Sequence, residues 1–122
     1  MKIKIKIKEG EVIAELNKSK TAREIFKILP IRTRAERWGD EIYFDIPLKL
    51  EVENPQKYVK LGDLAFWLEG SCFCIFFGKT PISKNIEQIK PASEVNVFGK
   101  ILEGMEILKR FKDRDEIVIE KI

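Results

Sequence analysis

Four side chains that could bind a ligand lie close together on either side of Gly39-Asp40. This dipeptide is typical of a tight turn between two antiparallel strands, so Trp38 is expected to lie opposite Glu41. Arg37 precedes Trp38, and Tyr43 follows on the return strand. Aromatic rings can form the walls of a pocket, and a guanidinium can anchor an anion. We therefore expect this hairpin to contribute a ligand-binding site.

Arg37 has two possible roles. The alternation along Ile31–Trp38 places it on the same face as Ala35, which directs it inward near one end of the fold. A buried arginine needs a carboxylate partner. The carboxylates that could fill this role are Glu41, Asp45 and Glu69. The alternative is that Arg37 holds an anionic ligand, and the sequence leaves both roles open.

Further candidates lie before and after this hairpin. Arg32 and Arg34 alternate with the residues expected in the core, and no pattern decides which of Arg32, Arg34 and Arg37 faces a pocket. Trp67 could form a second wall, although packing in the core explains it equally well. No catalytic residue is assigned. The ligand-binding candidates are Arg34, Arg37, Trp38, Glu41, Tyr43, Trp67, Cys72, Cys74 and Phe76.

Two cysteines and a lack of histidine limit the available chemistry. We expect Cys72 and Cys74 on opposite faces of a strand, as buried thiols with no disulfide between them. Two thiols make half of a tetrahedral zinc site and no histidine completes it, so no metal and no cofactor are predicted. The missing histidine also removes Ser–His and Cys–His pairs and the commonest general base at neutral pH. Whether the protein is an enzyme stays open.

The composition indicates one globular domain over residues 1–122, with 44% apolar and 35% charged residues. The net charge of +3 comes from 23 basic and 20 acidic residues spread along the chain, which argues against a nucleic-acid partner. No apolar run is long enough to span a membrane and no secretory signal begins the chain, so we expect a cytoplasmic protein. Abundant Lys, Glu and Ile suggest a heat-adapted source. The oligomeric state is left open.

Apolar periodicity predicts a mainly β fold. Ile and Lys alternate along Lys2–Lys8, as in a half-buried strand with a charged outer face. Thr21 and Glu24 fit a helix capping box, and Pro30 ends that helix. Other expected strands or alternating segments are Glu11–Leu16, Ile31–Trp38, Glu41–Ile46, Leu48–Val52, Asp63–Leu68, Cys72–Phe77, Val95–Leu102 and Glu116–Ile122, with a short helix at Gly104–Phe111. This pattern predicts a closed β-barrel of about eight strands whose ends are covered by two short helices.

Several segments resemble the cyclophilins, the peptidyl-prolyl isomerases built on an eight-stranded barrel. They are Val97–Lys100 with Glu103-Gly104-Met105, Lys20-Thr21-Ala22 with Phe26, and Gly70-Ser71 followed by Lys79-Thr80-Pro81. Three further segments make the resemblance more specific: Trp38–Phe44, Gly62-Asp63 and Cys74–Gly78. With these segments the chain is similar, over nearly its whole length, to a family of small archaeal and bacterial cyclophilin-like proteins without an established activity. The resemblance implies a cyclophilin-like barrel.

The catalytic positions of the cyclophilins are mostly substituted. Cys72 stands where the resemblance implies a peptide-binding glutamine, and Cys74 where it implies a pocket phenylalanine. Ile82 replaces a pocket tryptophan and Val95 replaces a histidine, while the segment with the catalytic arginine cannot be aligned. We therefore do not expect ordinary isomerase activity. The favoured hypothesis is a module that binds a small molecule or short peptide between Ile31–Phe44 and Trp67–Phe77, and the alternative is a divergent isomerase that uses a strand arginine.

Overall fold

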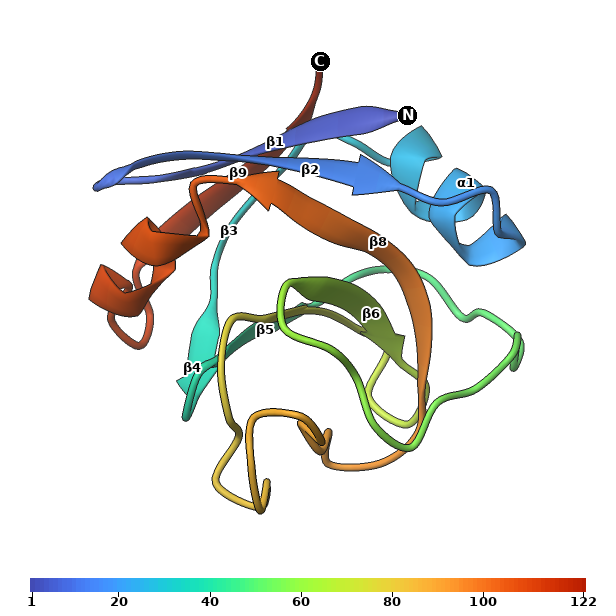
Figure 1. Cartoon of the computed structure of the whole chain (residues 1–122). Helices are drawn as coiled ribbons and strands as arrows, with labels where there is room; N and C mark the ends of the chain where they lie inside the picture. The colour runs from blue at the N-terminus through green and yellow to red at the C-terminus, as the bar shows by residue number, and fades with distance from the viewer.

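A computed structural model describes all residues from 1 to 122 as one nine-stranded antiparallel sheet that curls into a nearly closed barrel (Figure 1). One α-helix and one 3₁₀ helix accompany the sheet. The strands are β1 (Lys2–Ile7), β2 (Gly10–Leu16), β3 (Ile31–Arg34), β4 (Glu36–Trp38), β5 (Glu41–Asp45), β6 (Asp63–Trp67), β7 (Cys72–Phe76), β8 (Val95–Glu103) and β9 (Glu116–Lys121), and the helices are α1 (Lys20–Lys27) and η1 (Met105–Arg110). The predicted barrel class is confirmed.

The barrel approaches closure because one chain segment supplies both ends of the sheet. The strand order is β3-β9-β1-β2-β8-β6-β7-β5-β4, so the two outermost strands are consecutive in the sequence. They are separated by Ala35, whose N–H donates to Asp115 O at 3.1 Å and whose carbonyl accepts from Arg114 N at 2.8 Å. The prediction of a single strand over Ile31–Trp38 is therefore wrong: the chain leaves β9 at Ala35 and pairs with β5 instead.

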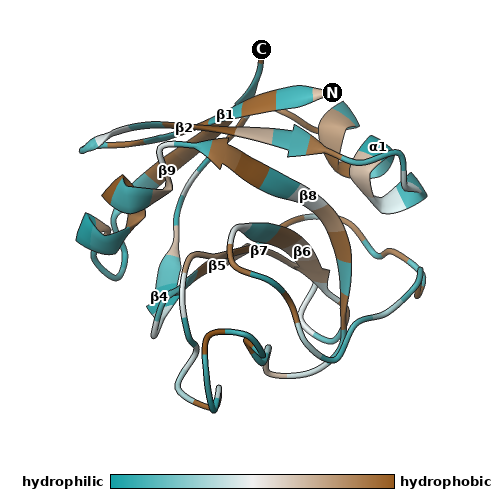
Figure 2. Cartoon of the chain, viewed as in Figure 1, coloured by the Kyte–Doolittle hydropathy of each residue, from teal (hydrophilic) through white to brown (hydrophobic).

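The inside of the barrel holds the main apolar core. Alternate residues of the strands point inward, including Ile3 and Ile5 on β1 and Ile117 and Ile119 on β9, all of them fully buried. The alternation appears as brown and teal bands along the strands in Figure 2. Phe73 stacks on Phe44 and meets Phe98 edge-on, each with ring centroids 5.0 Å apart. Such aromatic pairs add about 0.5–1.5 kcal/mol to the stabilisation from burial.

A second apolar cluster covers the outer face of the sheet where β5, β7, β6 and β8 lie side by side. Its buried members are Val59, Ala65, Cys72, Cys74, Phe76, Ile89 and Val95. Two irregular segments cross this face, one between β5 and β6 and one between β7 and β8. Gln56 in the first segment forms backbone bonds with Val95 of β8, and Val59 N donates to Ile89 O in the second segment. Every residue of β7 is consequently buried.

Cys72 and Cys74 belong to the same face of β7, so their prediction on opposite faces is wrong. Side chains alternate along a strand with a period of two, and residues two apart therefore share a face. Both cysteines are buried free thiols.

Helix α1 has its N-cap two residues before Thr21, the cap of the predicted capping box. Ser19 is the N-cap, and its hydroxyl accepts from Ala22 N at 3.1 Å. Thr21 lies inside the helix, only 2% exposed, and donates its hydroxyl hydrogen to Glu53. The Glu53 carboxylate also accepts from the backbone N–H groups of Lys20 and Thr21, and these bonds lower its pKa.

The alternating segment around Leu48–Val52 does not form a strand. Its backbone bonds the Asn96 side chain instead: Asn96 Nδ2 donates to Glu51 O at 2.9 Å, and Asn96 Oδ1 accepts from Glu53 N at 2.9 Å. Asn96 Nδ2 also lies 3.2 Å from Thr21 Oγ1. This buried amide therefore joins helix α1, the irregular segment and strand β8.

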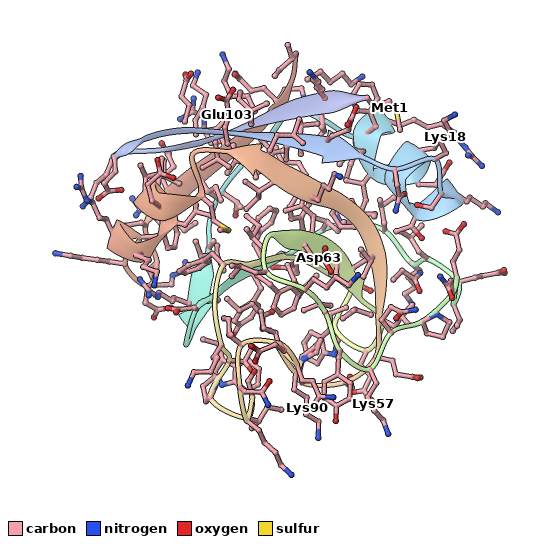
Figure 3. The ribbon with its side chains drawn as sticks, viewed as in Figure 1. Met1, Lys18, Lys57, Asp63, Lys90 and Glu103 are labelled. Carbon is pink, nitrogen blue, oxygen red and sulfur yellow. The ribbon has the colours of Figure 1, made fainter.

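The second predicted helix is confirmed as the 3₁₀ helix η1, which follows Gly104 in a left-handed conformation at φ 89°. None of the helices is long and apolar enough to cross a bilayer. Charged side chains such as Lys18, Lys57 and Lys90 project from the surface (Figure 3).

Asn96→Ala should lower the free energy of unfolding by about 2–4 kcal/mol, because it removes a buried amide and leaves the N–H of Glu53 and the carbonyl of Glu51 without that partner. Gln56→Ala is the control: this amide bonds only Asn54 in an exposed position, and its loss should change stability by less than about 0.5 kcal/mol. Urea unfolding measures both variants, and equal losses would contradict the role given to Asn96.

Candidate functional site

A cavity of about 150 Å³ lies on the outer face of the sheet, beside the second apolar cluster. Three aromatic side chains and one carboxyl group dominate its lining. The lining residues are Trp38, Glu41, Tyr43, Trp67, Cys74, Pro91, Ala92 and Val95. We call this cavity the aromatic pocket.

Strand register brings the pocket residues together. Trp38 on β4 is paired with Glu41 on β5, and Tyr43 on β5 is paired with Cys74 on β7. Trp67 on β6 is paired with Val95 on β8. The predicted pairing of Trp38 with Glu41 across the Gly39-Asp40 turn is thus confirmed. Strands on both sides of β7 contribute aromatic side chains to one cavity.

Glu41 is the one carboxyl group that lines the pocket. Its side chain is only 6% exposed, and Oε1 is buried without a hydrogen-bond partner in the protein. Burial raises the pKa of Glu41 to about 7, while hydrogen bonding with the Cys74 thiol opposes this rise to a smaller extent. A carboxyl group that gains and loses its proton near neutral pH is therefore held among apolar groups.

Trp67 is fixed by a contact outside the cavity, and the turn that follows Trp38 is attached to the segment after β7. Trp67 Nε1 donates to Ser93 Oγ at 2.6 Å, which attaches the β6 ring to the segment that carries Pro91 and Ala92. Trp38 precedes the Gly39-Asp40 turn, where Asp40 N donates to Lys79 O at 2.9 Å. The pocket walls are consequently held in place before any ligand arrives.

The segment after β7 that covers the sheet is stabilised by side chains, because it has no strand partner of its own. The Ser83 hydroxyl accepts from Thr80 N at 3.0 Å and from Lys90 N at 2.9 Å, while Thr80 Oγ1 donates to Lys90 O at 2.5 Å. Two hydroxyl groups thus bond much of the polar backbone that burial would otherwise leave unpaired. Pro91 and Ala92 reach the cavity from the end of this bonded loop.

The turn beside Trp38 requires a glycine. Gly39 has φ +62°, and a Cβ there would lie 2.8 Å from Pro81 Cδ and 2.9 Å from Lys79 O. The turn thus packs directly against the segment after β7.

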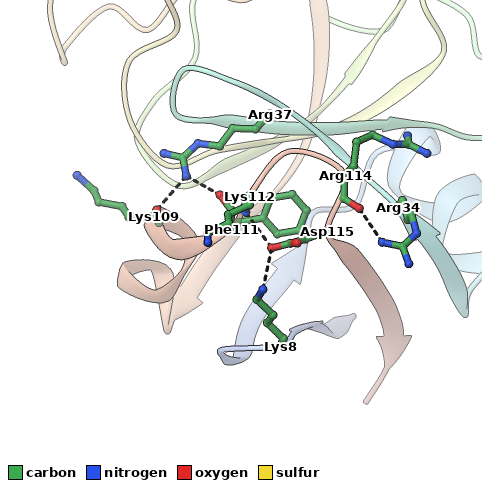
Figure 4. Close-up of polar contacts among 8 residues, drawn as sticks. All are labelled: Lys8, Arg34, Arg37, Lys109, Phe111, Lys112, Arg114 and Asp115. Atoms are coloured by element: carbon green, nitrogen blue, oxygen red, sulfur yellow. Dashed lines mark hydrogen bonds and ion pairs between the residues drawn. The ribbon is translucent and has the colours of Figure 1, made fainter.

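Arg37 does not line the aromatic pocket. Its Nη1 donates to Lys109 O at 2.9 Å and to Phe111 O at 2.7 Å, and these two bonds join β4 to the end of η1 (Figure 4). Its Nε donates to Gly39 O at 2.8 Å, and the guanidinium lies over the Phe77 ring. These contacts give the side chain a structural role.

The carboxylate partner of Arg37 is Asp40, with Nη2 and Oδ1 2.9 Å apart. The prediction that Glu41, Asp45 or Glu69 would be the partner is therefore wrong. Asp40 lies within the turn itself, and the guanidinium curls back over the turn to reach it.

Arg32 and Arg34 also lie away from the pocket, on the exposed side of β3. Arg32 pairs with Glu116 at 2.9 Å, and Arg34 Nη1 donates to Arg114 O at 2.9 Å. The structure thus brings together Trp38, Glu41, Tyr43, Trp67 and Cys74 from the predicted set, and it places all three candidate arginines elsewhere.

The remaining candidates lie beneath or beside the pocket. Phe76 is fully buried in the second apolar cluster, and Cys72 is buried with its thiol 3.4 Å from Gly70 O. Burial raises the pKa of Cys72 to about 11 and the pKa of Cys74 well above its ordinary value. Few thiolates form at neutral pH, so neither cysteine is a good nucleophile. No group of three carboxyl or thiol side chains lies close enough together to hold a metal ion.

Sequence reasoning missed three lining residues, Pro91, Ala92 and Val95. Pro91 and Ala92 come from an irregular segment without periodicity, and only its return across the sheet face brings them to the cavity. Val95 did carry a signal, because it stands where the resemblance implies a site histidine.

Arg37→Gln should lower the free energy of unfolding by about 2–4 kcal/mol, since it removes the donor of three carbonyl oxygens and of the Asp40 carboxylate. Arg32→Gln removes an arginine of equal charge from an exposed ion pair, so it should cost less than about 1 kcal/mol. Thermal and urea unfolding of the two variants measure the difference. A loss for Arg37→Gln no larger than for Arg32→Gln would contradict the structural role.

The raised pKa of Glu41 makes stability depend on pH. Near pH 5 the folded protein keeps the Glu41 proton while the unfolded chain has begun to lose it, so the free energy of unfolding falls as pH rises toward 7. Between pH 5 and pH 8 the ionisation of Glu41 should lower the free energy of unfolding of the wild-type protein by about 2–3 kcal/mol. The fall should be missing in Glu41→Gln, and identical pH profiles for the two proteins would contradict the raised pKa.

Comparisons with known proteins agree with the architecture of the barrel. Residues 1–120 match the family model described as cyclophilin-like. The chain is also similar to a solution structure of the hypothetical protein AF2241 from Archaeoglobus fulgidus, with 41% sequence identity and a TM-score of 0.83. The similarity covers 100% of this chain and 95% of that one. No curated protein matches the chain. The protein therefore belongs to the cyclophilin-like family.

Proposed function

We propose that the protein is a binding module that holds a small molecule, or one side chain of a short peptide, in the aromatic pocket. One observation carries this proposal: the unpartnered, buried carboxyl oxygen of Glu41 lies at a cavity lined by three aromatic rings. A buried polar group without a partner costs free energy and is rare in folded proteins, so it supports a functional role. A ligand with a suitably placed polar group would remove this cost.

The shape and chemistry of the pocket support binding. Apolar cavities with a few polar groups are the usual form of small-molecule sites. A cavity of about 150 Å³ has the size of an engineered protein cavity that binds benzene, so one compact group of a ligand fits inside. The bond between Trp67 and Ser93 and the packing of the Gly39 turn keep the walls in position, which limits the entropy lost on binding.

A divergent prolyl isomerase is the second candidate, and the family supplies its main support. That mechanism needs an arginine at the pocket. Arg32, Arg34 and Arg37 all lie elsewhere, each with its guanidinium bound to an oxygen acceptor. The geometry therefore favours binding over isomerisation.

A library of small polar and aromatic compounds should contain ligands that change the protein's tryptophan fluorescence. Trp38 and Trp67 are the only two tryptophans and both line the pocket, so their emission reports directly on its occupancy. A ligand should also raise the melting temperature, because it binds only the folded protein.

Ala92→Trp provides the decisive comparison for each hit. Ala92 is an exposed lining residue, so an indole there should fill the cavity mouth without disturbing the core, and it should abolish binding. Lys90→Trp places the same ring on a neighbouring residue that does not line the pocket, and it should leave the affinity within about threefold. A library without any ligand sensitive to Ala92→Trp, together with turnover of an X-Pro peptide at the rate of ordinary cyclophilins, would overturn the proposal in favour of isomerisation.

A further inference from the structure

The aromatic pocket combines two features that attract the same kind of ligand. Trp38, Tyr43 and Trp67 line it, and the face of an aromatic ring is negatively polarised and attracts cations. Glu41 adds a carboxyl group that is 6% exposed and has an unpartnered oxygen. None of the lining residues is basic. The rings and the carboxylate can therefore attract a positively charged group, and no lining residue supplies one.

We propose that the aromatic pocket binds a small alkylammonium group, whose N–H donates to the Glu41 carboxylate while its alkyl carbons lie against Trp38, Tyr43 and Trp67. This inference rests on the proposed binding function and adds the chemical class of the ligand. An anion would be repelled by the carboxylate. A purely apolar ligand would leave the buried carboxyl oxygen without a partner. An ammonium ion with at least one N–H satisfies both the carboxylate and the rings.

The charged groups around the pocket reinforce the preference for a cation. Glu36 lies opposite Tyr43 on β4, and Asp45 lies on β5 next to Cys72 of β7. The pKa of Tyr43 is raised by burial first and then by nearby acidic groups, of which Glu36 is the strongest. Two basic groups near these strands are bound to carboxylates, Arg37 to Asp40 and Arg114 to Glu36, whereas Lys90 beside Pro91 is exposed and does not line the pocket. Strands β6 and β8 contribute only Trp67 and Val95 to the lining, and neither can neutralise Glu41.

The titration of Glu41 should be coupled to binding. With a pKa of about 7, the group is largely neutral at pH 5 and ionised at pH 8. The other ionisable side chain in contact with it is the Cys74 thiol, whose pKa lies well above its ordinary value, so it stays neutral throughout this range. A cation should therefore bind more tightly as the pH rises, and binding near neutral pH should release a proton. A neutral ligand that accepts a hydrogen bond from protonated Glu41 would show the opposite pH dependence.

Four compounds of similar compact shape test the inference: trimethylammonium, tetramethylammonium, tert-butanol and pivalate. At pH 8, tryptophan fluorescence titrations should show that trimethylammonium binds at least about tenfold more tightly than tert-butanol. Tetramethylammonium, which has no N–H, should bind with intermediate affinity, and pivalate should not bind. At pH 5 the preference for trimethylammonium over tert-butanol should shrink to about twofold or less, and calorimetry in buffers of different ionisation enthalpy should detect the released proton.

Glu41→Gln is the matched variant, because it removes the charge and keeps the side-chain shape. It should lose the preference for trimethylammonium over tert-butanol. Glu36→Gln removes a carboxylate from the same strand pair outside the lining, and it should keep most of the preference. Equal affinities of trimethylammonium and tert-butanol in the wild-type protein would overturn the inference, as would a preference that survives in Glu41→Gln. If Glu41→Gln fails to fold, the pH series on the wild-type protein tests the same dependence on the Glu41 charge.

The test also separates this inference from the proposed function. If a neutral or anionic compound binds in a manner sensitive to Ala92→Trp and the ammonium compounds do not bind, the ligand class is wrong and the binding function stands. If the ammonium compounds bind equally well to Ala92→Trp, they bind outside the pocket and the inference fails. A peptide with dimethyl-lysine identifies the source of the group: tighter binding than the free amine indicates a peptide side chain, and equal binding indicates a small molecule.

Discussion

Strand β7 is buried on both faces, and this double burial determines the form of the rest of the protein. Phe73 and Ile75 belong to the core inside the barrel, whereas Cys72, Cys74 and Phe76 belong to the cluster outside it. An antiparallel sheet commonly exposes one face to water. Here irregular segments must cover the outer face, and the pocket lies at the edge of that cover.

The sequence predicted most features that depend on local periodicity, with the faces of Cys72 and Cys74 as an exception, and otherwise failed where a distant partner decides. Alternation along β1 and the turn at Gly39-Asp40 are local, and both appear as expected. Thr21 looked like a cap because nothing nearby in the sequence shows that it would bond Glu53. Leu48–Val52 has the alternation of a strand, yet the amide of Asn96 takes bonds that a strand partner would need. Long-range hydrogen bonds therefore account for these errors.

In the candidate site too, the sequence predicted what depends on local spacing and failed where distant residues decide. Trp38, Tyr43 and Glu41 were predicted from their spacing around one turn, and the register of β4 and β5 brings them to one cavity. The sequence left Arg37 two possible roles, a buried ion pair or a ligand anchor, and in the structure its donors are taken by the carbonyls of Lys109 and Phe111. Lys109 and Phe111 lie at the end of η1, far from the turn in the sequence, so the spacing of residues around the turn does not predict these bonds.

The residues inside the barrel and the irregular segments on its outer face form separate sets, and this affects how the protein can change over evolution. Mutations of Pro91 or Ala92 alter the cavity without touching the residues that pack inside the barrel. The same scaffold can therefore acquire a new ligand preference through a few substitutions in one loop, at little risk to folding. Relatives that share this barrel should accordingly diverge fastest in the covering segments, and similar overall structures should carry different specificities.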